Sequence, residues 1–324
     1  MNELYCEVEN LEIMSNIRGL SPSLQRRAFD ELNELPQNID RDVEELRMWL
    51  HYIPHLSARL DDQFLVAFLR NSRHNVERAM RKIEMFYTCR TSLPELMMNR
   101  DPLDPKILEI IRLGIGLPLP LTEKPDGPRY VLVRPGAYDA ARFTMIDIMK
   151  VANMICDILL IEDDNFVICG EVAIVDFKDV TKNHLLQLDP LLVKRLAVLN
   201  QEGSPLKQRG IHYLHTPPGF DVVFNLFKTI MQTRNLQTED HPIDIVIHPN
   251  THETLYDHIS RQILPLEYGG NSGSIEAIIQ FWEHKLISYR EYFAADGRYG
   301  TDESKRPPAF RHHHADFVTA SAFD

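Results

Sequence analysis

Beyond residue 105, short strand-like runs alternate with long helical stretches, and this alternation constrains the fold more than any other feature of the sequence. The strand-like runs are RYVLVRP (129–135), GEVAIVDF (170–177), RGIHYLH (209–215) and IDIVIHP (243–249). The helical stretches are Thr144–Ile161, Asp189–Asn200, Gly219–Arg234 and Ser274–Phe293. Strands separated by helices of this length predict an α/β layer with a mainly parallel sheet.

The first hundred residues contain helical patterns only. In SPSLQRRAFDEL, Ser21 is placed to cap a helix and Pro22 to occupy its first turn. Further helices are predicted from Asp40, from Asp61 or Asp62, and over NVERAMRKIEMFYTCRTSL, where the residues expected to be buried are Val76, Met80, Ile83 and Tyr87. We therefore predict a helical module in residues 1–98, an α/β domain in 105–293, and a polar, disordered tail in 294–324.

Composition narrows the class of protein. The 324 residues carry a formal charge of −12, which counts against nucleic acid as a partner because phosphate binding favours a basic surface. The four cysteines form no CxxC pair, and the acidic N-terminus does not resemble a signal peptide. No uncharged stretch approaches the ~20 residues that span a bilayer. These features predict a soluble cytoplasmic protein with free thiols.

The motifs that would indicate catalysis or metal binding are incomplete. HETLYDH lacks the second histidine of a zinc-protease helix, because Tyr256 stands at that position, and Pro249 separates His248 from His252. GGNSGS does not fit a nucleophile elbow, and no glycine-rich phosphate loop is present. The histidine run at 312–314 is assigned to the tail, with a weak metal site as the alternative. We predict no enzyme activity, no metal and no cofactor.

One predicted helix, Gly219–Arg234, places a continuous apolar stripe beside basic residues. The stripe consists of Phe220, Val223, Phe224, Phe227, Ile230 and Met231. Lys207 and Arg209 precede it. Taken alone, this pattern is also typical of an ordinary amphipathic helix packed on a core.

Several segments together resemble the CRAL-TRIO lipid-binding family. They are FLRNSRHNVERAMRKIEMFYTCR, YVLVRPGAYD, PLKQRGIHYLHTPPGFDVVFNLFK and ILPLEYGGNSGSIEAIIQFW. The resemblance runs from about Ile39 to about Tyr292 and is similar to the branch of α-tocopherol transfer protein, cellular retinaldehyde-binding protein and insect-type relatives. It implies a helical N-terminal module followed by an α/β domain that has a hydrophobic pocket and a movable helical gate.

The resemblance also implies roles for individual residues. The pocket residues that it implies are Met149, Ala152, Asn153, Cys156, Val175, Leu196, Leu199, Asn200 and Ile211. The apolar stripe of 220–231 becomes the gate. The cations expected to contact anionic lipid are Lys207, Arg209, Lys228 and Arg234. Two departures bear on phosphoinositide binding: Ser72 stands where a second arginine is common, and QTEDHP after the gate is acidic.

The function predicted from this resemblance is a carrier of one small hydrophobic ligand, such as a retinoid, a tocopherol or a similar terpenoid. It would act as a cytoplasmic monomer that contacts membranes peripherally, with weak docking to phosphoinositides or other anionic lipids. The alternatives are a phospholipid or phosphoinositide exchanger, and an adaptor with a vestigial pocket. The buried amides of Asn153 and Asn200 would pair with each other or with backbone, or would meet a polar group of the ligand.

Overall fold

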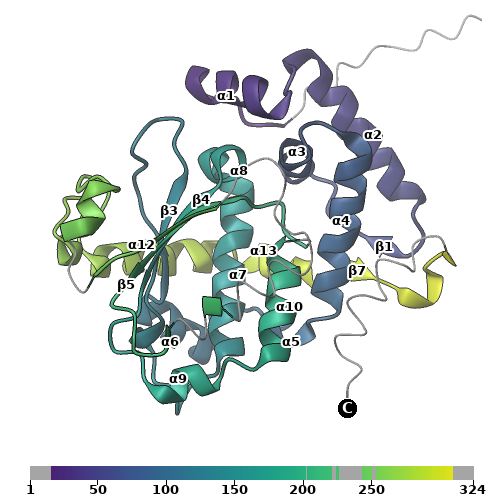
Figure 1. The fold of residues 1–324 in the computed structure, drawn as a ribbon. Coiled ribbons are helices and arrows are strands. Elements are labelled where there is room, and N and C mark those ends of the chain that lie inside the picture. Colours follow the sequence, from purple (N-terminus) through teal and green to yellow (C-terminus); the bar gives the residue numbers. More distant parts are fainter. Residues whose placement is uncertain (1–15, 202, 221–223, 226–242, 250–252, 309–324) are drawn as a thin grey trace, which may run out of the picture.

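The computed structural model describes residues 16–201, 203–220, 224–225, 243–249 and 253–308. Its first part is helical, as predicted, with α1 (Pro22–Leu32), α2 (Ile39–Tyr52), α3 (Asp62–Asn71), α4 (Val76–Thr91) and α5 (Pro94–Met97). These helices gather on one side of the molecule in Figure 1. Short 3₁₀ turns occur at Pro36–Asn38, Pro135–Ala137, Glu253–Asp257, Leu266–Tyr268 and Glu303–Lys305.

Side-chain caps fix where these helices begin. The Ser21 hydroxyl accepts the Leu24 N–H, and the Asp61 carboxylate accepts the Phe64 N–H, so both predicted starts are confirmed. In α4, Ile83 and Tyr87 are buried as expected, whereas Val76 and Met80 are only half-buried. The aromatic rings of α3 and α4 pack together, with 4.9 to 6.2 Å between ring centroids, around Phe64.

The second part is built on a five-stranded sheet. Its strands are β2 (Gly116–Pro118), β3 (Arg129–Val133), β4 (Glu171–Asp176), β5 (Gln208–Leu214) and β6 (Asp244–Ile247), in the order β2-β3-β4-β5-β6. The pairs from β3 to β6 are parallel, which confirms the predicted sheet, and only β2 runs antiparallel to its neighbour. Sequence patterning missed β2, because it has three residues and ends in a proline that cannot donate to a strand partner.

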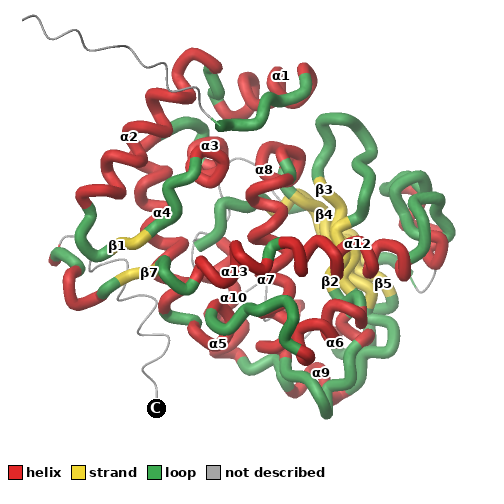
Figure 2. Tube along the Cα trace, turned by 180° about the vertical axis from the view of Figure 1, so that it is seen from behind, coloured by secondary structure: helices red, strands yellow, loops and turns green. Residues whose placement is uncertain are grey.

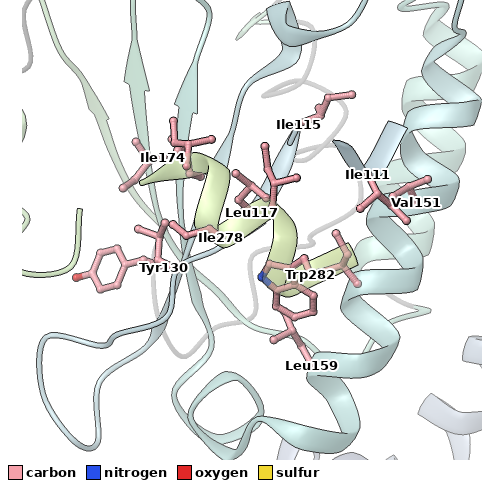
Figure 3. Packing of buried hydrophobic residues seen from close by; sticks show 14 of the residues in the cluster. Ile111, Ile115, Leu117, Tyr130, Val151, Leu159, Ile174, Ile278 and Trp282 are labelled. Carbon is pink, nitrogen blue, oxygen red and sulfur yellow. The ribbon is translucent and has the colours of Figure 1, made fainter. Parts of the chain in front are cut away.

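Helices flank the sheet. They are α6 (Pro105–Leu113), α7 (Met145–Glu162), α8 (Asp164–Cys169), α9 (Lys182–Leu186), α10 (Pro190–Gln201), α12 (Ile275–Ser288) and α13 (Arg290–Asp296). Figure 2 shows α12 crossing one face of the strands. In Figure 3, Ile278 and Trp282 of α12 pack among side chains of the sheet and α7, including Ile174 and Leu159. The single helix predicted over 274–293 is divided at Tyr289 into α12 and α13.

The prediction of a disordered tail is wrong for residues 294–308. Strand β7 (Gly300–Thr301) pairs with β1 (Leu56–Ser57) of the helical module. Arg306 is only 2% exposed and donates to Thr88 Oγ1 at 2.8 Å, with further ion pairs to Glu84 and Glu303. These ionic contacts inside the helical module account for the order of a polar segment. Residues 309–324 lie outside the described part of the chain.

The helical module and the sheet domain share buried contacts. Leu160 and Val167, next to the sheet, belong to the same apolar cluster as Phe64 and Phe68 of α3. Arg90 of α4 contacts both oxygens of Asp157 in α7, at 2.9 and 2.8 Å. The boundary predicted between residues 98 and 105 therefore separates two patterns of structure that are joined through a common core.

Candidate ligand-binding site

The two faces of the sheet differ in burial. On the face beneath α12, the side chains of Tyr130, Leu132, Val172, Ile174 and Leu214 are buried in the main core. On the opposite face, the side chains along β3 and β4 and those of β5 from Ile211 onward are only half-buried. Its half-buried residues are Val131, Val133, Glu171, Ala173, Val175, Ile211 and Tyr213. We call these seven residues the half-buried sheet face.

Helix α7 shows the same asymmetry. Its start is fixed by a capping box, in which Thr144 and Asp147 bond each other's backbone N–H groups. Ile148, Val151, Ile155 and Ile158 are buried in the main core. One stripe of the helix remains half-buried, and it holds the pocket residues predicted on this helix: Met149, Ala152, Asn153 and Cys156.

Glu171 lies on the half-buried sheet face and Cys156 on the half-buried stripe of α7, and the two side chains are near enough to interact electrostatically. Burial raises the pKa of the Cys156 thiol, and the negative charge of Glu171 raises it further, so the two groups lie within Coulombic range. Burial raises the pKa of the Glu171 carboxyl to about 7. Both side chains are thus surrounded by protein and yet keep accessible surface. A close-packed interior would bury such side chains completely, so the described side chains alone do not enclose these two residues.

The structure brings together some of the predicted pocket residues and separates others. Ala152, Asn153 and Cys156 of α7 and Val175 and Ile211 of the strands all belong to the half-buried surfaces. Met149 and Leu196 pack at the side of a separate cluster formed by α4, α5 and α10.

Two residues of α10 that are predicted for the pocket lie apart from the half-buried surfaces. Leu199 is buried in that separate cluster, with Cys89 of α4 and Leu93. Asn200, the next residue, is exposed. The reason is the orientation of α10, which turns Val198 and Leu199 toward the helical module and leaves Asn200 in solvent.

The two asparagine amides do not pair with each other. The Asn153 amide donates from Nδ2 to the Met149 carbonyl, one turn earlier in α7, at 2.8 Å. This contact confirms backbone pairing as the interpretation for that amide nitrogen.

The described part of the predicted gate begins on the half-buried sheet face. Phe220 and Phe224 place their ring centroids 5.0 and 6.0 Å from that of Tyr213 on β5. Phe177, after β4, lies 5.1 Å from Phe220. Sequence analysis missed Phe177 and Tyr213, although Tyr213 alternates in phase with Ile211. The gate residues Val223, Phe227, Ile230 and Met231 lie outside the described residues.

The predicted docking cations are placed only in part. The Arg209 guanidinium bonds the Cys169 carbonyl at 2.8 Å and Glu31 of α1 at 3.2 Å, so it is engaged within the protein. Lys207 is half-buried just before β5. Lys228 and Arg234 lie outside the described residues.

Three histidines of the sheet domain lie close together. His212 Nδ1 is 3.0 Å from His248 Nε2, and the His258 ring lies 5.6 Å from each of the other two rings. Burial, together with the charges of His248 and His258, lowers the pKa of His212 to about 4. Within the described ranges, no group of three or more histidine, cysteine or acidic side chains is arranged to hold a metal ion. No helix in this part of the chain is long and apolar enough to cross a membrane.

Two domain families and several named proteins match parts of this chain. Residues 121–270 match the CRAL/TRIO domain, and residues 35–107 match the Pinta-like UBA domain. The human protein named alpha-tocopherol transfer protein-like is 27% identical over 279 residues, which cover 86% of this chain and 78% of that protein. Human clavesin-2 is 26% identical over 292 residues, which cover 89% and 85%. The crystal structure of Sfh5 superposes with a TM-score of 0.41 and 11% identity, over 84% of this chain and 100% of that one.

Proposed function

The chain belongs to the CRAL-TRIO family through its domain at residues 121–270, and on that premise we propose that it carries one small hydrophobic ligand. The ligand would lie between the half-buried sheet face and α7. The observation that supports this proposal is the accessible apolar surface on both sides of that space, at Ala173, Val175, Ile211 and Ala152. The name of the alpha-tocopherol transfer protein-like relative favours a tocopherol as the ligand, and a retinoid or a similar terpenoid would suit the same apolar surfaces.

Energetics explain why such a carrier acts at membranes. Each buried methylene contributes about 0.8 kcal/mol, so a ligand with roughly twenty apolar carbons gains on the order of 15 kcal/mol by leaving water. Release into water would therefore be very slow. At a membrane, the ligand exchanges one apolar medium for another, and only the opening of the gate remains as a barrier.

The edge of the sheet supplies an apolar route toward such a membrane. Ile245 and Ile247 of β6 are 43% and 51% exposed, and they stand in register with Ile211 and Tyr213. The half-buried sheet face thus continues to the outside of the protein. We assign membrane contact to this edge and to the apolar gate stripe that begins at Phe220.

Cation-mediated docking to phosphoinositides would contribute less to membrane contact than the apolar residues do. Arg209 would first have to exchange its ion pair with Glu31, so the electrostatic gain of reaching a lipid phosphate is reduced. Peripheral, reversible contact through apolar residues is sufficient for transfer. We propose that the protein is cytoplasmic. We also propose that it is a monomer without catalytic activity, because a carrier needs neither a partner subunit nor a chemical step.

Native mass spectrometry of protein purified from its own cells tests the proposal. A one-to-one complex with a phosphorus-free lipophilic molecule supports the carrier function. A phosphorus-containing ligand would instead identify a phospholipid exchanger. If no lipid is retained, and none of a terpenoid panel binds saturably, the carrier proposal is rejected and the adaptor remains.

A vesicle assay tests the gate separately. Phe224→Asp should slow transfer of a loaded retinoid between neutral vesicles, because it places a charge in the apolar stripe. Asn225→Asp is the matched control, since it adds the same charge at the neighbouring exposed position. Equal slowing by both changes would argue against the stripe as the membrane contact.

A further inference from the structure

Glu171 is an unusual residue for the place it occupies. It begins β4 and lies on the same side of the strand as Ala173 and Val175, within the half-buried sheet face. Its register neighbours on β3 and β5 are Arg129 and Gln208, whereas its neighbours along the same face of β4 are apolar. The carboxyl therefore stands where a polar strand end meets an apolar surface, and a charge on it is unfavourable unless a partner or water solvates it.

The described groups of the protein do not supply a partner for this carboxyl. Among the residues that the structure describes, no side chain or N–H group forms a hydrogen bond or ion pair with its oxygens. Arg129, its register neighbour on β3, is bonded instead to Asp163 at 2.5 Å and to the Leu119 carbonyl at 2.9 Å. Arg209, on the neighbouring strand β5, is held by Glu31.

The charge state of Glu171 is consistent with this isolation. Burial raises its pKa to about 7, and no cation among the described residues acts in the opposite direction. Near neutral pH the group is therefore present both as a carboxylic acid and as a carboxylate. A ligand group that pairs with it must be able to accept a hydrogen bond from one form and to donate one to the other.

We propose that Glu171 is the polar contact of the ligand site and that the ligand is a lipophilic alcohol whose hydroxyl bonds this carboxyl. A hydroxyl both donates and accepts, so it satisfies either form of Glu171. An aldehyde can only accept, and a carboxylate or a phosphate would be repelled by the ionised form. The apolar body of the alcohol would then lie along Ala173 and Val175 and across from Ala152.

Cys156 makes no comparable contact. Its thiol is a weak hydrogen-bond donor and remains protonated because burial and the charge of Glu171 raise its pKa. It forms part of the apolar wall beside the carboxyl. The inference rests on the proposed carrier function and narrows it from terpenoids in general to those that end in a hydroxyl.

Binding of retinol, retinal and retinoic acid tests the proposal, because these probes share one skeleton and differ in the terminal group. In the full chain, we expect retinol to bind about tenfold more tightly than the other two, the effect of one buried hydrogen bond. Glu171→Leu should remove this preference while retaining retinal binding. Glu171→Gln, which can still donate and accept, should keep most of it.

Val175→Ala provides the matched control on the same face of β4. It should weaken the binding of all three probes by a similar factor and leave their order unchanged. If the wild-type protein binds the three probes equally, or if Glu171→Leu keeps the retinol preference, the role of Glu171 is rejected and the carrier function stands. If none of the three probes binds, the role of Glu171 in retinoid selection is rejected, and the retained lipid and the terpenoid panel alone decide the carrier function.

Discussion

The Tyr268 hydroxyl donates to Asp176 Oδ2 at 2.5 Å and so joins the turn before α12 to the end of β4. His215 Nδ1 lies 2.6 Å from the other carboxylate oxygen, one residue beyond β5. Asp176 and Tyr268 are both buried. One carboxylate therefore holds three segments together at the carboxyl ends of β4 and β5, where Phe177 and the predicted gate follow.

Tyr268→Phe should lower the free energy of unfolding by about 1–3 kcal/mol, because it leaves a buried carboxylate oxygen without its donor. Urea denaturation measures this loss. Tyr256→Phe is the control, since the Tyr256 hydroxyl donates 3.0 Å to the Tyr268 carbonyl from a half-buried position. A loss no larger than that of the control would show that the Asp176 contact contributes little.

Acid should weaken the same contact. Burial acts to raise the pKa of Asp176, but hydrogen bonds from Tyr268, the Lys178 N–H and His215 outweigh it and leave the pKa below the ordinary 3.8. The stabilisation is therefore fully present above pH 3.8 and is lost as the pH falls through the lower, folded-state value. In Tyr268→Phe, the acid-unfolding midpoint should move to higher pH.

The buried ion cluster between the two parts of the chain should be far more sensitive. Asp157→Asn leaves Arg90 and Arg100 with one carboxylate, that of Asp296, and should destabilise the protein by about 3–5 kcal/mol. Asp101→Asn breaks an equally well-formed arginine pair, with Arg290, whose side chains are 47% and 54% exposed. That control should change little. Similar urea midpoints for both variants would show that the buried cluster contributes little to stability.

Enlarging one side chain on each face of β4 tests whether the half-buried face adjoins unfilled space. Val172→Phe, on the core face, should destabilise by about 1–3 kcal/mol through overpacking. Ala173→Phe, one residue along, should leave thermal stability nearly unchanged and abolish retinoid binding, because its ring would enter the proposed ligand space. Equal destabilisation by both variants would mean that the two faces are packed alike.

Much of the fold follows from local patterns. Ser21, Asp61 and Thr144 cap their helices through short-range contacts, and the β-rich runs pair in parallel as their spacing predicts. The family motifs also identified Ala152 and Cys156 on one stripe of α7. These features are set by residues close in the sequence.

The errors have a common physical origin in contacts between distant residues. The sequence predicts Leu199 and Asn200 for the pocket, whereas contacts with α4 and α5 determine which side of α10 is buried. Residues 294–308 are held in place by the ion pair of Arg306 with Glu84, which lies more than two hundred positions earlier in the sequence. Glu171 was missed because its significance lies in the absence of a bonded partner among the described residues, which a linear pattern does not display.

His212 should make the protein more stable as the pH rises from about 4 to 6.5. Its pKa falls from 6.5 to about 4 because of burial first, and then because of the charges of His248 and His258, which the carboxylate of Asp244 opposes only weakly. Between these values the unfolded chain binds more protons than the folded one, so deprotonation favours folding. His212→Asn should flatten this part of the profile of unfolding free energy against pH.

Glu171 should act in the opposite sense, and the wild-type profile will partly hide both effects. Its folded pKa of about 7 exceeds the ordinary 4.5, so between these values the folded state holds the extra proton and stability falls as the pH rises. The neighbouring Cys156 thiol stays protonated throughout this range and does not contribute. Glu171→Gln removes the fall, which amounts to about 3 kcal/mol, and should expose the rise due to His212. Profiles measured by urea unfolding at closely spaced pH values separate the two groups. An unchanged slope between pH 4.5 and 7 in Glu171→Gln would show that this carboxyl is ionised in the folded protein, and that a partner stabilises it.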